Sequence, residues 1–256
     1  MIIDCFSYNG ESELFEIRYN ILSPFVDEFR VIEFDKTFSG KWKQSKFIQH
    51  WDKVKHYFIA EKIWGKYQNE AKESPNTEYG KGAEHWVREF CQKEALKDCL
   101  TDLKDGDIVL IGDVDELPDF NKIDLLSNLP IKLKLKVYTY WLNNKSNEEF
   151  WGTLITPYKY IKENCLNHLR SNELFRTNEE MGWHFTSLGG YEKVKEKLID
   201  SYTKDSYAND WVLENLKDNL ENNKDFLGRD FTYRIDESEW PDYLKTNKEK
   251  YKHLCK

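Results

Sequence analysis

Apolar runs and helical repeats alternate along the first half of the 256-residue chain. Four short apolar runs, many of their residues β-branched or aromatic, predict strands, and they cover residues 2–8, 29–34, 56–60 and 108–111. A run that is apolar throughout, such as 108–111, predicts a strand covered on both faces. Residues 11–22 and 84–103 space their apolar side chains along one face of a helix. Strands that alternate with helices predict an α/β domain.

The second half has a more mixed pattern. Residues 131–140 alternate apolar and basic side chains, which predicts a half-exposed strand, and its lysines indicate an exposed sheet edge. Residues 150–156 are expected to form the neighbouring strand, and the polar, glycine-marked residues 65–82 a loop. Three further helices are expected, at 123–129, 192–202 and 209–220. The length allows one large domain or two small ones, and no internal repeat is visible.

The strand that begins at Ile108 runs directly into three carboxylates, Asp113, Asp115 and Glu116, and then into Pro118. Proline cannot donate to a strand ladder, so we expect the strand to end before it. Open α/β sheets bind ligands at the carboxyl ends of their strands, and side chains two apart on an extended chain point to one side. Two carboxylates placed there suit Mg²⁺ or Mn²⁺ with a phosphorylated substrate. A solvated acidic turn is the competing interpretation.

Composition narrows the classes of function. The net charge is −8 with both signs mixed, which argues against a broad nucleic-acid-binding surface. The chain has 9 Trp, 15 Tyr and 15 Phe, and such side chains line sugar- and base-binding clefts as well as cores. Its five cysteines are scattered without a CxxC pair, which is typical of free thiols in a reducing compartment. No signal-type or membrane-spanning apolar stretch is visible, so we expect a soluble cytoplasmic protein.

Two other segments combine residue types that bind ligands. Residues 35–43 carry three lysines beside aromatic residues at the end of a predicted strand, although an ordinary solvated loop has the same composition. His184 lies between Trp183 and Phe185 in a glycine-bracketed stretch. Its imidazole can face a metal or a substrate, and a histidine that is hydrogen-bonded in the core is the competing interpretation.

Three stretches, in order along about three quarters of the chain, resemble glycosyltransferase family 17. The first runs from Ile3-Asp4-Cys5-Phe6 to Thr37-Phe38-Ser39-Gly40. The second joins Trp86-Val87-Arg88-Glu89 to Asp113-Val114-Asp115-Glu116-Leu117-Pro118. The third is Gly182-Trp183-His184-Phe185-Thr186, similar to the family's GWHFS. The absence of a membrane anchor and stem departs from the Golgi members, and the Lys- and Asn-rich composition indicates a microbial or viral source.

The resemblance implies a GT-A fold. This is a single Rossmann-like α/β domain over residues 1–256, with a mixed central sheet and flanking helices. Residues 1–120 would form the nucleotide-binding half and residues 121–256 the acceptor-side half. The DxD motif would hold Mn²⁺ or Mg²⁺ on the diphosphate of a UDP-sugar, with Asp113, Asp115 and His184 as metal ligands. The residues that the resemblance places at the donor are Asp4, Phe6, Tyr8, Glu33, Thr37, Gly40, Lys43, Arg88, Asp113, Arg170 and Trp183.

The implied reaction is an inverting transfer of a sugar, N-acetylglucosamine or another, from the UDP-sugar to a glycan or glycoconjugate hydroxyl. Inversion needs a carboxylate base, and Glu116 and Glu180 are the two candidates. A haloacid-dehalogenase-like phosphatase is the rival enzyme class, but Leu117 stands where that class has Thr or Val. A binding protein without turnover and a transferase acting on modified nucleic-acid bases also stay open as hypotheses. The net charge disfavours a nucleic-acid partner.

Overall fold

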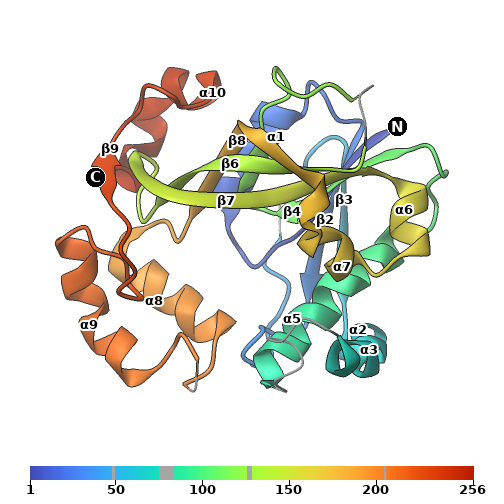
Figure 1. The fold of residues 1–256 in the computed structure, drawn as a ribbon, viewed down its shortest axis with the longest axis horizontal. Coiled ribbons are helices and arrows are strands. Elements are labelled where there is room, and N and C mark those ends of the chain that lie inside the picture. The colour runs from blue at the N-terminus through green and yellow to red at the C-terminus, as the bar shows by residue number, and fades with distance from the viewer. Residues whose placement is uncertain (48–49, 75–82, 126–128, 205) are drawn as a thin grey trace.

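The structure is a computed structural model that describes residues 1–47, 50–74, 83–125, 129–204 and 206–256. Its strands are β1 (Ile2–Ser7), β2 (Glu28–Phe34), β3 (Val54–Ile59), β4 (Ile108–Asp113), β5 (Glu116–Pro118), β6 (Ile131–Thr139), β7 (Asn144–Pro157), β8 (Arg176–Thr186) and β9 (Tyr233–Ile235). They form one sheet in the order β3-β2-β1-β4-β7-β6-β8-β5, with β9 paired to β7 (Figure 1). The first four strands of this order are parallel, and β7 joins β4 antiparallel. The fold is therefore α/β with a mixed central sheet.

Helices cover both faces of the sheet. The α-helices are α1 (Ser12–Leu22), α2 (Glu61–Trp64), α3 (Gln68–Glu73), α5 (Glu84–Glu94), α6 (Tyr158–Glu163), α7 (Leu166–Ser171), α8 (Gly190–Ser201), α9 (Asp210–Glu221) and α10 (Asp242–Thr246). The 3₁₀ helices are η1 (Gly65–Tyr67), η2 (Ala95–Cys99), η3 (Glu173–Phe175) and η4 (Lys248–Leu254). Phe15 of α1 packs in one core cluster with Phe6, and Phe90 of α5 packs in another with Ile3. Because Phe6 and Ile3 both belong to β1, the two helices lie on opposite sides of the sheet.

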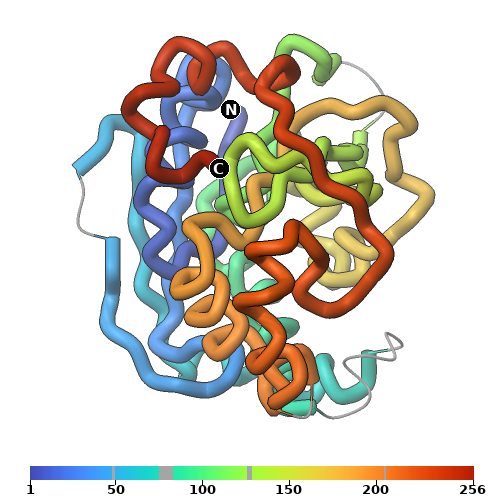
Figure 2. Tube along the Cα trace, turned by 90° about the vertical axis from the view of Figure 1, so that its left-hand side faces the viewer, coloured from blue at the N-terminus to red at the C-terminus, as the bar shows by residue number. Residues whose placement is uncertain are grey.

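The last part of the chain packs against α1, and Figure 2 shows this segment in red beside the blue helix. Leu244, Tyr251 and Leu254 are buried in the same core cluster as Phe15. An ion pair, Lys250–Glu16, and a hydrogen bond between His253 and Glu13 join the surfaces of the two segments. The C-terminal segment therefore completes the core on the α1 side of the sheet.

Most elements predicted in the first half are confirmed within one to three residues at each end. The expected loop at 65–82 is wrong as far as it is described, because η1 and α3 occupy residues 65–73, while residues 75–82 lie outside the described residues. The helix expected at 123–129 is absent at 123–125, and residues 126–128 are not described. The long helix expected at 84–103 is α5 followed by η2, which ends at Cys99.

The expectation that residues 131–140 form a sheet edge is also wrong. Strand β6 lies between β7 and β8. Its lysines are accommodated by ion pairs with acidic neighbours: Lys134 pairs with Glu149, and Lys136 pairs with Glu239 at 3.0 Å. The alternation of apolar residues and lysines in β6 therefore reflects one polar face of an interior strand, and not an exposed sheet edge.

Candidate active site

The acidic turn between β4 and β5 is held by one buried arginine. Nε and Nη2 of Arg18 donate to the two carboxylate oxygens of Asp4 at 2.7 and 2.6 Å, and both side chains are fully buried. Nη1 of Arg18 donates to the main-chain oxygen of Asp113 at 3.0 Å and to that of Glu116. Buried carbonyl groups need hydrogen-bond donors, so the Asp4–Arg18 pair fixes the path of the chain through the DVDE turn.

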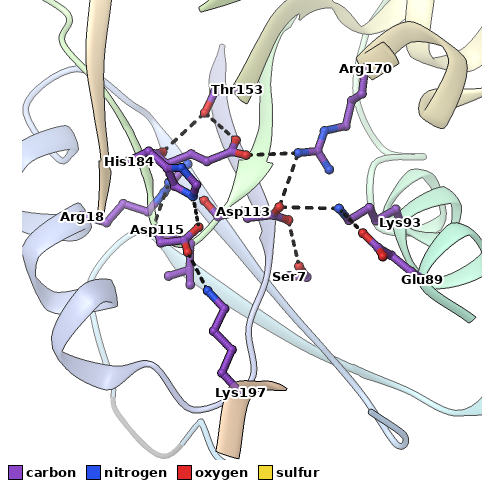
Figure 3. Close-up of polar contacts among 12 residues, drawn as sticks. Ser7, Arg18, Glu89, Lys93, Asp113, Asp115, Thr153, Arg170, His184 and Lys197 are labelled. Atoms are coloured by element: carbon purple, nitrogen blue, oxygen red, sulfur yellow. Dashed lines mark hydrogen bonds and ion pairs between the residues drawn. The ribbon is translucent and has the colours of Figure 1, made fainter. Parts of the chain in front are cut away.

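Two glycines make room for the carboxylate of Glu116. A Cβ at Gly112 would lie 2.7 Å from Oε2 of Glu116, and a Cβ at Gly152 would lie 2.7 Å from its carboxyl carbon. The Glu116 residue is only 1 % exposed, and the hydroxyl of Thr153 donates to Oε2 at 3.2 Å (Figure 3). Any larger residue at either glycine would displace this carboxylate.

Cations flank the carboxylates of Asp113 and Glu116. Arg170 on α7 lies 3.6 Å from Asp113 and 3.4 Å from Glu116, and Lys93 on α5 lies 3.6 Å from Asp113 (Figure 3). Burial opposes ionisation of Asp113, but the charges of Lys93 and Arg170 lower its pKa to about 2. Burial, together with the nearby charge of Asp113, raises the pKa of Glu116. The cations therefore favour the ionised form of Asp113 in particular.

Asp115 is paired with Lys197 and His184. Lys197 on α8 donates to Oδ2 of Asp115 at 3.1 Å, and Nε2 of His184 lies 3.6 Å from Oδ1. Although burial opposes it, these two partners hold the pKa of Asp115 well below its usual range. The His184 ring stacks on Phe150 with centroids 4.1 Å apart, and its buried Nδ1 has no hydrogen-bond partner among the described residues. Burial opposes protonation of His184, but the charge of Asp115 raises its pKa.

The loop after β2 contacts α5 at the same edge of the sheet. Nε of Arg88 donates to the main-chain oxygen of Phe38 at 2.5 Å. Gly40 has a φ of +92°, and a Cβ there would lie 3.0 Å from the Arg88 guanidinium carbon. The hydroxyl of Thr37 accepts from the main-chain N–H of Lys41 at 3.1 Å. The structure thus brings Thr37, Gly40 and Arg88 together, and their contact with a donor stays a prediction.

The same loop reaches the turn after β1. Lys43 donates to the side chain of Asn9 at 2.5 Å, and the main-chain N–H of Asn9 donates to the Glu11 carboxylate at 2.7 Å. Burial lowers the pKa of Lys43 and raises that of Glu11. The charges of Lys197 and Asp115 also act on Glu11, so the β1–α1 turn borders the acidic cluster.

Several residues expected at the donor are instead buried in the core. Asp4 forms a buried ion pair with Arg18. Phe6 is fully buried, and the centroid of its ring lies 4.5 Å from Cζ of Arg18. Tyr8 is buried, and Trp183 is buried with its indole N–H donating to the main-chain oxygen of Glu239 at 2.6 Å. These side chains support the site from the interior, and direct contact with a donor stays a prediction.

Glu33 and Glu180 do not join the acidic cluster. Glu33 is fully buried and accepts hydrogen bonds from Ser45, from the main-chain N–H groups of residues 46 and 47, and from His56. It therefore anchors the segment after the β2 loop. Glu180 lies on β8 opposite Lys134 of β6, and within the described residues its side chain makes no hydrogen bond or ion pair with the cluster.

Sequence reasoning missed five residues at the site: Glu11, Lys93, Phe150, Thr153 and Lys197. One helical turn separates Lys93 from Glu89, with which it pairs at 2.7 Å, and this spacing places Lys93 on the same helix face as the recognised WVRE segment. The others have no comparable signal, because tertiary packing alone brings their segments to the strand end.

Asp113 and Asp115 would be the ligands of a divalent ion at the strand end. Their oxygens are the ligands that Mg²⁺ and Mn²⁺ prefer, and the Asp113 side chain is 34 % exposed. His184 does not form a group of three metal ligands with these carboxylates. Among the described residues, only Glu70, Glu94 and Cys165 have three potential ligand atoms within 4.8 Å of one another. Glu94 in that group already accepts hydrogen bonds from the main-chain N–H groups of residues 166 and 167. An ion at the strand end would take its remaining ligands from a phosphorylated substrate or water.

The paired carboxylates and cations lie at the carboxyl ends of the parallel strands, which is where open α/β sheets bind their ligands. Residues 1–200 match the model of glycosyltransferase family 17, and the chain belongs to that family. The whole acidic cluster with its cations lies within the match. No curated protein and no solved structure matches the chain. Among the described residues, no helix is long and apolar enough to cross a membrane.

Proposed function

We propose that the protein is a metal-dependent, inverting glycosyltransferase of the GT-A fold. It transfers a sugar, N-acetylglucosamine as the first choice, from a UDP-sugar to a hydroxyl of a glycan or glycoconjugate. The observation that carries this proposal is the DVDE turn, held by Arg18, which has Asp113 and Asp115 at the carboxyl end of β4 among three cations. Membership of the family supports the transferase class.

The cations of the site suit a diphosphate leaving group. A nucleoside diphosphate departs easily only when its developing charge is neutralised, and a divalent ion on Asp113 and Asp115 would supply part of that neutralisation. Lys93 and Arg170 lie at the partly exposed carboxylate of Asp113, so their charges are placed to contact phosphate oxygens. Arg88 and Lys43 add two positive charges beside the loop that follows β2. The chain's own residues thereby bind and orient the diphosphate.

Neither carboxylate predicted as the base is well placed for that role. Glu116 is buried against Thr153 and Arg170, so we propose that it orients Arg170. Glu180 lies outside the cluster. The proton acceptor is proposed among the other carboxylates that border the cluster, Glu11 and Glu89. A Gln variant of the true base should lose turnover and keep UDP binding, whereas the other variant should keep both.

Calorimetric titration with UDP and UDP-N-acetylglucosamine tests the donor site. We expect binding in Mn²⁺ that disappears with a chelator and in Asp113→Asn and Asp115→Asn. Asp242→Asn is the matched control, because that side chain is 98 % exposed and distant in sequence from the cluster. UDP binding that is unaffected by chelator and by both variants, or no UDP binding at all, would overturn the proposal. Release of UDP in the presence of glycan acceptors then distinguishes an enzyme from a binding protein.

A further inference from the structure

A pocket of about 310 Å³ lies at the C-terminal end of α1, away from the acidic cluster. The turn after β5, strand β8 and the start of α10 complete its wall. Its size falls at the lower end of the range for small-molecule sites, and is therefore suited to one ring and not to an extended ligand.

Aromatic rings form much of the wall. Phe25 is 41 % exposed and stacks parallel on Phe120, with ring centroids 5.0 Å apart and an interplanar angle of 6°. Trp183 and Trp240 also line the pocket, and their indole N–H groups are already used by main-chain oxygens at 2.6 and 2.8 Å. The indoles are therefore fixed in orientation, but they are only 7 % and 3 % exposed, so the accessible apolar ring surface belongs chiefly to the Phe25–Phe120 pair.

The polar part of the wall is acidic and amidic. It consists of Asn20, Asp119, Asn121 and Asp242, and no lysine, arginine or histidine is among the described lining residues. Carboxylate and amide oxygens accept hydrogen bonds from hydroxyl groups, and the Asp119 carboxylate repels phosphates and other anions. The Asp242 side chain is 98 % exposed and pairs with Lys245 at 3.7 Å, so it contributes less to this repulsion. Apolar ring faces beside acceptors for hydroxyl groups match a sugar ring, which has an apolar face and a polar rim.

We propose that this pocket binds one neutral pyranose ring, a hexose or N-acetylhexosamine residue of a glycan, at a site separate from the donor site. The separation follows from the fold. Glu11, which borders the acidic cluster, directly precedes α1, whereas Asn20 lies near the other end of this 11-residue helix, about 16 Å long at 1.5 Å per residue. On β8, Trp183 lines the pocket while the adjacent His184 points to the cluster, as strand alternation requires.

The C-terminal segment supplies part of this pocket. Trp240, Pro241, Asp242 and Tyr243 line it, and all four lie beyond the residues that match the family. The pocket is therefore a property of this chain's own C-terminal segment together with α1, and not of the acidic cluster.

Saturation-transfer NMR and tryptophan fluorescence with methyl β-glucoside, N-acetylglucosamine and glucuronic acid test the proposal on the full chain. We expect saturable, millimolar binding of a neutral sugar, and binding of glucuronic acid at least tenfold weaker. Phe25→Ala and Asn121→Ala should each weaken neutral-sugar binding about tenfold, while UDP binding in Mn²⁺ stays unchanged. Trp211→Ala is the matched control, because this exposed aromatic residue lies outside the pocket.

Three results would overturn the proposal. The first is no saturable binding of either neutral sugar, and the second is binding of glucuronic acid as strong as that of the neutral sugars. The third is neutral-sugar binding that UDP competes away and that the Phe25→Ala and Asn121→Ala variants do not weaken. The Asp113→Asn variant distinguishes failure of the pocket proposal from failure of the proposed donor site. It should remove UDP binding without changing sugar binding in the pocket.

Discussion

Replacing Arg18 with methionine is expected to destabilise the protein by about 3–5 kcal/mol, because the Asp4 carboxylate would stay buried without its charge partner. Both side chains are fully buried, so water cannot replace the lost guanidinium. The main-chain oxygens of Asp113 and Glu116 also lose a donor. Since domains of this kind have a total stability of about 5–15 kcal/mol, the loss should be large and still measurable.

Urea unfolding followed by tryptophan fluorescence measures this change. The double variant Asp4→Leu with Arg18→Met removes both charges, and should be more stable than Arg18→Met alone. Arg234→Met is the control: this guanidinium is 68 % exposed and pairs only at the surface with Asp236, so we expect a change within about 0.5 kcal/mol. A cost below about 1 kcal/mol for Arg18→Met, or strict additivity in the double variant, would refute the reasoning about the buried pair.

Three further predictions concern the same site. Gly112→Ala should destabilise the fold by about 1–3 kcal/mol, because its Cβ would lie 2.7 Å from the Glu116 carboxylate, whereas Gly106→Ala, with nothing within 4 Å, should be tolerated in thermal unfolding. Lys197→Met should raise the pKa of Asp115 toward its unfolded value near 3.9 and reduce stability at neutral pH. Because a carboxylate with a depressed folded pKa loses its contribution as pH falls below the unfolded value, that deficit should shrink below about pH 4 in urea titrations, and a constant deficit would contradict this account. Lys93→Met should weaken UDP binding about tenfold in calorimetry, and an unchanged affinity would show that this ammonium does not contact the diphosphate.

Much of the fold of residues 1–120 could be predicted from the sequence. Local patterns were sufficient for β1, α1, β2 and β4, since each is a continuous apolar run or a helical repeat. The carboxylates also lie at the end of β4, as the apolar run into Pro118 indicated. These features depend on neighbouring residues in the chain, and so a single sequence contains the information.

The missed features depend on which segments meet. Period-two alternation shows that Trp183 and His184 face opposite sides of β8, but it does not show that the tryptophan enters the core. The lysines of β6 looked like edge residues because their acidic partners, such as Glu239, are far away in sequence. Lys197 reaches Asp115 from a helix more than 80 residues later, a contact that no local pattern records.

The packing of the C-terminal segment on α1 has a practical consequence for dissecting the protein. A chain shortened to residue 200, where the family match ends, would expose the apolar side of α1 that Leu244, Tyr251 and Leu254 now cover. An exposed apolar surface of that kind promotes association between molecules. Such a fragment is therefore expected to aggregate, although it contains every residue of the acidic cluster, and the border of sequence similarity is not a border at which the fold can be cut.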